Sequence, residues 1–272
     1  MAVTRAVKAS SGHRRRFSGL LPYAMLRPRR PRWWEEILII AFGYWMYTLG
    51  RNAIPTHPAV AFRHARAIDD LQDRLHIGWE LTFNHFVASH EWLAQGFDYY
   101  YATLHFVLTP ATMIWLFLRK PDVYRGARTV LVSITLIALL GFYLYPTAPP
   151  RLLPGYVDTV IKYHTWGSFA DPNIAEHSNQ FAAMPSLHVG WALWVGIAVF
   201  QCAQGRWRWL GLAYPMGTCV VIIGTANHFG LDAVGGALVV ALAFGLQYLL
   251  SGHGAFTPPR AAAPVAGSGA CE

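Results

Sequence analysis

Long apolar runs alternate with short polar connections along most of this chain. The runs cover residues 37–49, 99–118, 130–145, 187–202, 210–225 and 231–250. Most of them approach the ~20 residues that a helix needs to cross the hydrocarbon part of a bilayer, and the first can extend to residue 54. The pattern predicts six membrane-spanning helices.

The segment at 57–96, between the first two runs, has a different pattern. Its apolar residues recur at helical spacing against arginines and aspartates; they are Ala65, Ile68, Leu71, Leu75 and Trp79. This spacing is typical of an amphipathic helix that lies in the membrane interface. We therefore expect an all-α fold, a bundle of six transmembrane helices with an extra interfacial amphipathic helix.

These patterns divide the chain into four parts. Residues 1–33 form a basic arm that we expect to be disordered, and residues 34–97 hold the first membrane helix and the amphipathic segment. Residues 98–251 form the predicted membrane core, which includes a long polar loop at 146–183. Residues 252–272 are rich in Ala, Pro and Gly, which indicates a disordered tail.

Composition agrees with lipid as the solvent. The chain is 54% hydrophobic and 13% charged, whereas soluble domains carry about a quarter charged residues. Three widely spaced cysteines predict neither a disulfide framework nor a zinc site.

The net charge of +8 is unevenly distributed, because nine Lys and Arg residues precede the first acidic residue, Glu35. Beside a membrane segment, such an arm indicates attraction to anionic lipid rather than to nucleic acid. Further basic residues lie at 119–128 and 206–208. The positive-inside rule then predicts a multi-pass protein of the cell membrane with both termini cytoplasmic.

Three polar clusters interrupt the apolar background on the opposite, extracytoplasmic side. The first is the sequence PTAPPR at 146–151. Its prolines stiffen the backbone as it leaves a membrane helix, so Arg151 can be presented with little entropy loss. The alternative is a helix stop followed by an arginine that reaches to lipid headgroups.

The second cluster is PSLH at 185–188. Pro185 suits the first turn of the fourth span, where free backbone N–H groups and the Ser186 hydroxyl attract anions. His188 would lie one turn into that helix, and its alternative role is that of a packed interfacial histidine.

The third cluster contains His228 and Asp232, four residues apart. On a helix the two would share one face, so the carboxylate can fix the tautomer and orientation of the imidazole. An aspartate at the edge of a membrane span usually has a function, although a helix cap is the alternative. Together the clusters predict a site for a phosphate group.

The order and spacing of PTAPPR, PSLH and H-x-x-x-D resemble the type 2 phosphatidic acid phosphatase superfamily, over residues 98–250. The resemblance is strongest to the branch with inositol-phosphoceramide-synthase-like phosphotransferases. It implies a metal-independent, cofactor-free enzyme that acts on a phospholipid, a polyprenyl phosphate or a phosphoinositol lipid. It implies His228 as a nucleophile that forms phosphohistidine, Asp232 as its orienting group and His188 as general acid. Arg151 and Ser186 would bind the phosphate.

Two cations of the broader superfamily pattern are missing. The superfamily pattern has a lysine before the first motif, where this chain is apolar around Leu144. It also has a Ser-Arg pair before the third motif, where this chain has apolar residues near 221–222. Lys162 and Arg51 are candidate substitutes. With fewer cations, the site suits a phosphodiester, which carries less negative charge than a monoester. The branch that this chain most resembles contains phosphotransferases, so we expect transfer to an alcohol rather than simple phosphatase hydrolysis.

Two other functions fit some of the same residues. His188, His228 and Asp232 could form a two-histidine, one-carboxylate metal site, although Arg151 would be a poor neighbour for a dication. A transporter could use the intramembrane polar residues for ligand movement, although these residues cluster at one face. His105, Glu80 and Asn84 could line the cavity, and packing explains them equally well.

Overall fold

A computed structural model describes residues 20, 31–53, 57–165 and 180–258, and this part of the chain is helical without strands. The all-α prediction is confirmed. The α-helices are α2 (Trp33–Ala53), α3 (Pro58–Arg74), α4 (Glu80–Ala88), α5 (Glu91–Arg119), α6 (Pro121–Leu144), α7 (Thr159–Tyr163), α9 (Leu187–Cys202), α10 (Leu210–Gly224) and α11 (Gly230–Ser251). Two short 3₁₀ helices, η1 (Pro150–Leu152) and η2 (Gly205–Trp209), complete the set.

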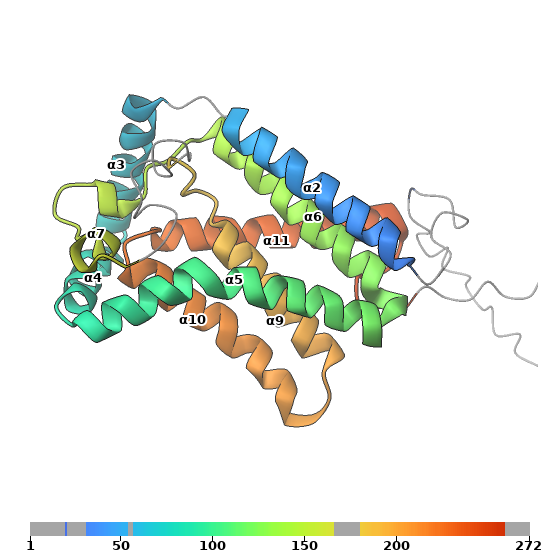
Figure 1. Cartoon of the computed structure of the whole chain (residues 1–272). Helices are drawn as coiled ribbons and strands as arrows, with labels where there is room; N and C mark the ends of the chain where they lie inside the picture. The colour runs from blue at the N-terminus through green and yellow to red at the C-terminus, as the bar shows by residue number, and fades with distance from the viewer. Residues whose placement is uncertain (1–19, 21–30, 54–56, 166–179, 259–272) are drawn as a thin grey trace, which may run out of the picture.

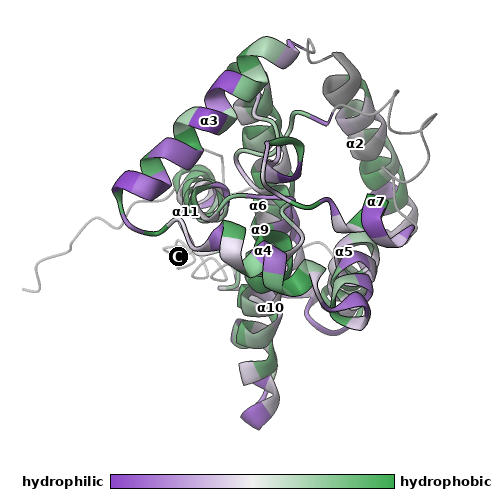
Figure 2. Cartoon of the chain, turned by 90° about the vertical axis from the view of Figure 1, so that its left-hand side faces the viewer, coloured by the Kyte–Doolittle hydropathy of each residue, from purple (hydrophilic) through white to green (hydrophobic). Residues whose placement is uncertain are grey.

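The long helices form a bundle with one polar end. The short helices α4 and α7 gather with α3 at that end, drawn on the left of Figure 1, and the α5–α6 turn lies at the other end. Viewed from the α3 end, α3 and α7 carry hydrophilic residues, whereas the helices behind them are mostly hydrophobic (Figure 2). Helix α9 is central, because it packs against α5, α6, α10 and α11.

Close packing of α9 on α10 depends on two glycines. A Cβ atom at Gly196 would lie 2.3 Å from the carbonyl oxygen of Gly211, and one at Gly211 would lie 2.4 Å from that of Gly196. Small residues allow such close approach of two helices in a membrane. On the other side of α9, Trp194 is fully buried and its indole N–H donates to the carbonyl of Ala127, on α6, at 2.9 Å. These contacts fix the central helix.

Three described helices, α5, α6 and α11, are long and apolar enough to cross a membrane. Their outward faces carry large apolar side chains that are more than half exposed, such as Phe106, Leu136 and Leu242. An extensive exposed apolar surface marks contact with lipid or another protein. The apolar helix α9 is shorter, with 16 residues. Length and composition therefore support three spans, and the count of six stays a prediction.

Two predicted spans begin earlier than expected, α5 at Glu91 instead of 99 and α6 at Pro121 instead of 130. The residues before the predicted starts include polar side chains that are paired inside the bundle, and a search for apolar runs does not include them. Arg128 of α6 donates to the carboxylate of Glu36 on α2. Asp98 of α5 accepts hydrogen bonds from the hydroxyls of Thr159 and Thr165 at 2.6 and 2.9 Å.

The segment predicted as one amphipathic helix at 57–96 is instead α3, α4 and the first turn of α5. The chain turns at His76, whose φ is +60°. Helix α3 does bury Ala65 and Ile68 against the rest of the protein. Leu71, Leu75 and Trp79, expected on the same face, are instead 46–55% exposed. The interfacial location of this segment stays a prediction.

The predicted loop at 146–183 is partly structured, since it contains η1 and α7. Residues 166–179 of this loop lie outside the described residues, as do most of the basic arm and residues 259–272 of the predicted tail. Pro185 does not lie in the first turn of α9 as expected. Ser186 is the N-cap and Leu187 begins the helix.

Candidate active site

The beginnings of α9 and α11 lie side by side at the site. The backbone N–H of Ser186 donates to the carbonyl of Asp232 at 2.9 Å. A Cβ atom at Gly236, one turn further along α11, would lie 2.5 Å from the carbonyl oxygen of Ser186. The absence of a side chain at Gly236 thus brings the second and third sequence clusters together.

His228 lies in the turn before α11 and has different surroundings at its two ring nitrogens. Nδ1 is 2.9 Å from the carbonyl oxygen of Ala183 and 3.4 Å from Oδ2 of Asp232. Nε2 is buried and has no hydrogen-bond partner among the described residues. Because Nδ1 faces two acceptors, it holds the proton in the neutral ring, and Nε2 keeps a free lone pair.

Asp232 is fully buried and does two things at once. Its Oδ2 accepts a hydrogen bond from the backbone N–H of Phe229 at 2.9 Å and so caps α11. The same oxygen faces His228, while Oδ1 has no hydrogen-bond partner among the described residues. The helix cap and the orienting carboxylate, which the sequence offered as alternatives, are therefore compatible.

His188 is the second residue of α9 and lies against His228. The two ring centroids are 5.6 Å apart. His188 also stacks on Tyr101, with 4.2 Å between the ring centroids. Its ring forms a T-shaped contact with the ring of His105, with 4.4 Å between the centroids and an interplanar angle of 74°. The structure thus brings both predicted catalytic histidines within reach of one small group.

Arg151 lies in η1 and is buried beside the same turn. Its backbone N–H donates to the carbonyl of Ala226 at 2.8 Å, and its guanidinium donates to the side-chain oxygen of Asn227. Its Nε lies 3.3 Å from Oδ2 of Asp158. Burial lowers the pKa of the Arg151 guanidinium, but arginine keeps its charge in proteins. All three sequence clusters therefore converge on His228.

The family profile of the PAP2 superfamily matches residues 66–246, which include all three clusters. The chain belongs to the PAP2 superfamily. Members are generally phosphatases or phosphotransferases of lipids in membranes, so the resemblance is confirmed at this level. The match identifies the superfamily and not a branch within it. No curated protein and no solved structure matches the chain.

The two missing PAP2 cations are not replaced by Lys162 in this structure. Its ammonium group donates to the carbonyl of Ala88, at the C-terminal end of α4, at 2.6 Å. The side chain of Arg51, the other candidate, lies outside the described residues. Arg151 itself is shared with Asp158, which reduces the positive charge that it offers to an anion.

The sequence suggested Glu80 only as a residue that could line the cavity and did not single out Gln72, yet both side chains hold the beginning of α11. The N–H of Gly230 donates to Oε1 of Glu80 at 2.6 Å, and the N–H of Leu231 donates to Oε1 of Gln72 at 3.1 Å. The Gln72 amide also donates to Oε2 of Glu80 at 2.9 Å. Both side chains are buried, and burial raises the pKa of Glu80 to about 7.

The hydrogen bonds that the first amides of α11 already make determine which helix end is open to an anion. The first amides of α11 already have carboxylate or amide partners, whereas α9 has one side-chain cap, the Ser186 oxygen at 3.4 Å from the N–H of Val189. A helix N-terminus attracts anions when its N–H groups can reach them. Of the two helix ends in this PAP2 protein, the beginning of α9 therefore has more backbone N–H groups without side-chain partners among the described residues.

Proposed function

We propose that this protein is an integral membrane phosphotransferase or phosphatase that acts on a lipid-linked phosphate ester through a phosphohistidine on His228. The single observation that carries this proposal is the ring of His228, engaged at Nδ1 and buried without a partner at Nε2. A nucleophile needs this state, with one nitrogen fixed and the other free to attack.

In the first half-reaction, Nε2 of His228 attacks phosphorus and forms an N–P bond. The P–O bond to the leaving alcohol breaks, and His188 donates its proton to the departing oxygen. Arg151 and the N-terminus of α9, with Ser186, stabilise the negative oxygens of the phosphoryl group. Asp232 and the carbonyl of Ala183 stabilise the positive charge that develops on the His228 ring.

In the second half-reaction, His188 takes a proton from water or from an alcohol. The resulting oxygen attacks phosphorus, the N–P bond breaks, and its electron pair returns to Nε2 of His228. Water gives a phosphatase, and an alcohol gives a phosphotransferase. The same two histidines therefore serve both outcomes.

The charge at the site supports transfer from a phosphodiester, as in the inositol-phosphoceramide-synthase-like branch. Arg151 is partly neutralised by Asp158 at 3.3 Å, and Lys162 has a partner elsewhere. One shared guanidinium and a helix end suit a single negative charge better than two. The alternative is hydrolysis of a monoester, such as phosphatidic acid or a polyprenyl phosphate.

We propose further that α2, α9 and α10 also cross the membrane, which gives six spans. Both termini would then be cytoplasmic and the site extracytoplasmic, since the basic residues of η2 and of the α5–α6 turn lie away from the histidines.

The metal alternative has little geometric support. Asp232 approaches His228 from its Nδ1 side, so the carboxylate and the free Nε2 do not point at one shared position. Among the described residues, no group of three or more His, Cys, Asp or Glu is arranged to hold a metal ion. A transporter remains the non-enzyme alternative, and turnover by the purified protein separates it from the proposal.

The test uses purified protein in detergent, with phosphatidic acid or a phosphodiester lipid as substrate, and with or without a lipid alcohol. We expect acceptor-dependent product, unaffected by EDTA. His228→Ala should reduce turnover to background, and His188→Ala should reduce it by about a hundred- to ten-thousandfold. An alkaline quench should trap phosphohistidine in the wild type and none in His228→Ala.

Each part of the proposal has its own contrary result. Wild-type turnover in a folded His228→Ala variant contradicts the nucleophile. Loss of activity in EDTA with recovery in zinc or manganese favours the metal site. Faster phosphate release from the monoester, without acceptor-dependent product, makes the protein a phosphatase.

A further inference from the structure

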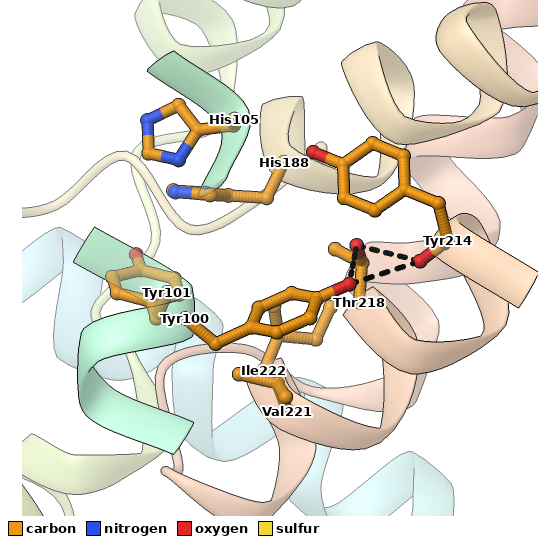
Figure 3. A pocket seen from close by; sticks show the side chains of 8 residues that line it. All are labelled: Tyr100, Tyr101, His105, His188, Tyr214, Thr218, Val221 and Ile222. Carbon is orange, nitrogen blue, oxygen red and sulfur yellow. Dashed lines mark hydrogen bonds between the residues drawn. The ribbon is translucent and has the colours of Figure 1, made fainter. Parts of the chain in front are cut away.

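A small cavity lies next to the ring of His188, between α5, α9 and α10 (Figure 3). Its lining includes the rings of Tyr101, His105 and His188 and, on α10, Tyr214 and Thr218. The free space is about that of one water molecule. Tyr101 lines this cavity and is also near the proposed nucleophile, because the ring centroids of Tyr101 and His228 are 6.4 Å apart.

His105 is the unexplained residue of this cavity. It is 9% exposed, it lies within the apolar helix α5, and its ring interacts with the backbone of Tyr101, one turn earlier. Its buried Nδ1 has no hydrogen bond of good geometry to any described residue. Buried polar atoms in proteins almost always have a partner, and an ionisable residue within a membrane helix usually marks a functional site. An occupant of the cavity would give Nδ1 a well-aligned hydrogen bond.

The neighbouring contact indicates which occupant fits. His105 and His188 have ring centroids 4.4 Å apart, so a hydroxyl bound at Nδ1 of His105 lies next to the proposed general base. A hydroxyl both donates and accepts hydrogen bonds, and it therefore fits Nδ1 in either tautomer. The size of the cavity suits water or the hydroxyl end of an unhindered primary alcohol, and we expect a branched carbinol carbon to fit less well.

We propose that this cavity is the acceptor subsite, in which His105 binds the hydroxyl that His188 deprotonates. The inference rests on the proposed phosphohistidine reaction and concerns its second half. The O–H proton passes to His188, the oxygen attacks phosphorus, and the N–P bond to His228 breaks. His105 thereby selects water and unhindered primary alcohols as acceptors.

The test separates the two half-reactions with a p-nitrophenyl phosphate ester. Release of p-nitrophenol in the first turnover reports formation of phosphohistidine, and this leaving group needs little help from a general acid. Product analysis in the presence of methanol or 2-propanol reports the acceptor. In the wild type we expect transfer to methanol and water, and about tenfold less transfer to 2-propanol.

His105→Phe removes the ring nitrogens and keeps an aromatic ring of slightly larger size. We expect first-turnover release to stay within about twofold of the wild type, while steady-state turnover falls at least about tenfold and the trapped phosphohistidine fraction rises. His105→Asn keeps a polar atom near the position of Nδ1 and should recover most of the turnover. A merely structural role for His105 would slow both half-reactions together.

Thr109→Val is the matched control. Thr109 lies one turn further along α5, and its hydroxyl is also buried without a partner among the described residues, but it does not line the cavity. This variant should change neither half-reaction nor the ratio of methanol to water products.

Two results would overturn the subsite. One is equal slowing of both half-reactions in folded His105→Phe, and the other is an unchanged rate with an unchanged ratio of methanol to water products. Turnover without trapped phosphohistidine in the wild type would instead contradict the proposed nucleophile. In that case the product ratio of His105→Phe still decides whether the cavity binds the acceptor.

Discussion

At the scale of single residues, the state of His228 depends on two acceptors and not on Asp232 alone. The carbonyl of Ala183 is 2.9 Å from Nδ1, closer than the carboxylate oxygen at 3.4 Å. A backbone carbonyl cannot be removed by substitution, so it preserves the tautomer when the carboxylate is lost. Asp232 adds its negative charge and the cap on α11.

We therefore expect Asp232→Asn to lose about a hundredfold in kcat. In the serine-protease triad the same change costs about ten-thousandfold, because it leaves the histidine in the wrong tautomer. Here Ala183 still accepts from Nδ1, so the loss is mainly that of charge. The measurement is kcat with matched circular dichroism and thermal unfolding. A loss as large as in the triad would mean that Asp232 alone sets the tautomer.

The sequence identified this pair for a reason that was only partly correct. The spacing of His228 and Asp232 suggested one face of a helix, yet His228 precedes α11, which begins at Gly230. The two side chains meet because Asp232 turns back to cap the helix. Asp158 and Asn227, which hold Arg151, could not be assigned in this way, since such contacts join separate segments of the chain.

At the scale of elements, Gln72 of α3 and Glu80 of α4 hold the beginning of α11, next to the turn that contains His228. These hydrogen bonds join residues about 150 positions apart, so no local periodicity predicts them. Glu80 also lies near the carboxylates of Asp69 and Asp232, which add to the effect of burial on its pKa. The PAP2 match begins at residue 66, so both side chains fall within the family domain.

The raised pKa of Glu80 predicts how stability depends on pH. The pKa is about 7 in the folded protein and 4.5 ordinarily, so the folded state binds more protons between these values. The stabilisation from protonated Glu80 is complete below pH 4.5 and is lost as the pH rises through 7. Glu80→Gln, which keeps an acceptor for Gly230, should remove this dependence.

The measurement is the melting temperature in detergent from pH 4.5 to 8. The wild type should lose more stability over this range than Glu80→Gln, because only the wild type has the Glu80 carboxyl. Asp69 and other groups titrate in both proteins, so their contribution cancels in the comparison. The matched control is Glu91→Gln, at an exposed position in the first turn of α5. This variant should keep the wild-type dependence of melting temperature on pH. Parallel curves for wild type and Glu80→Gln would show that Glu80 is ionised throughout.

At the scale of the whole molecule, the bundle has chemically different ends. The end with α3, α4 and α7 (Figure 1) holds the site, because Asn84 of α4 donates to the carbonyl of Gly224, at the end of α10 nearest His228. The other end of α10 follows η2, which contains Arg206 and Arg208. Hydropathy predicted the helices, while their beginnings were obscured by buried polar pairs such as Arg128 with Glu36.

This polarity gives the final prediction, which concerns orientation in the cell membrane. Ser89, between α4 and α5, and Gln204, before η2, are both exposed and lie toward opposite ends of the bundle. In a variant with its native cysteines replaced, Ser89→Cys should react with an impermeant maleimide in intact cells. Gln204→Cys should react only after permeabilisation, because the positive-inside rule retains the arginine-rich end in the cytoplasm. Both sites reacting alike in intact cells would mean that the two ends do not lie across a bilayer. The reverse pattern would place His228 in the cytoplasm, where the acceptor alcohol would have to be found in the inner leaflet.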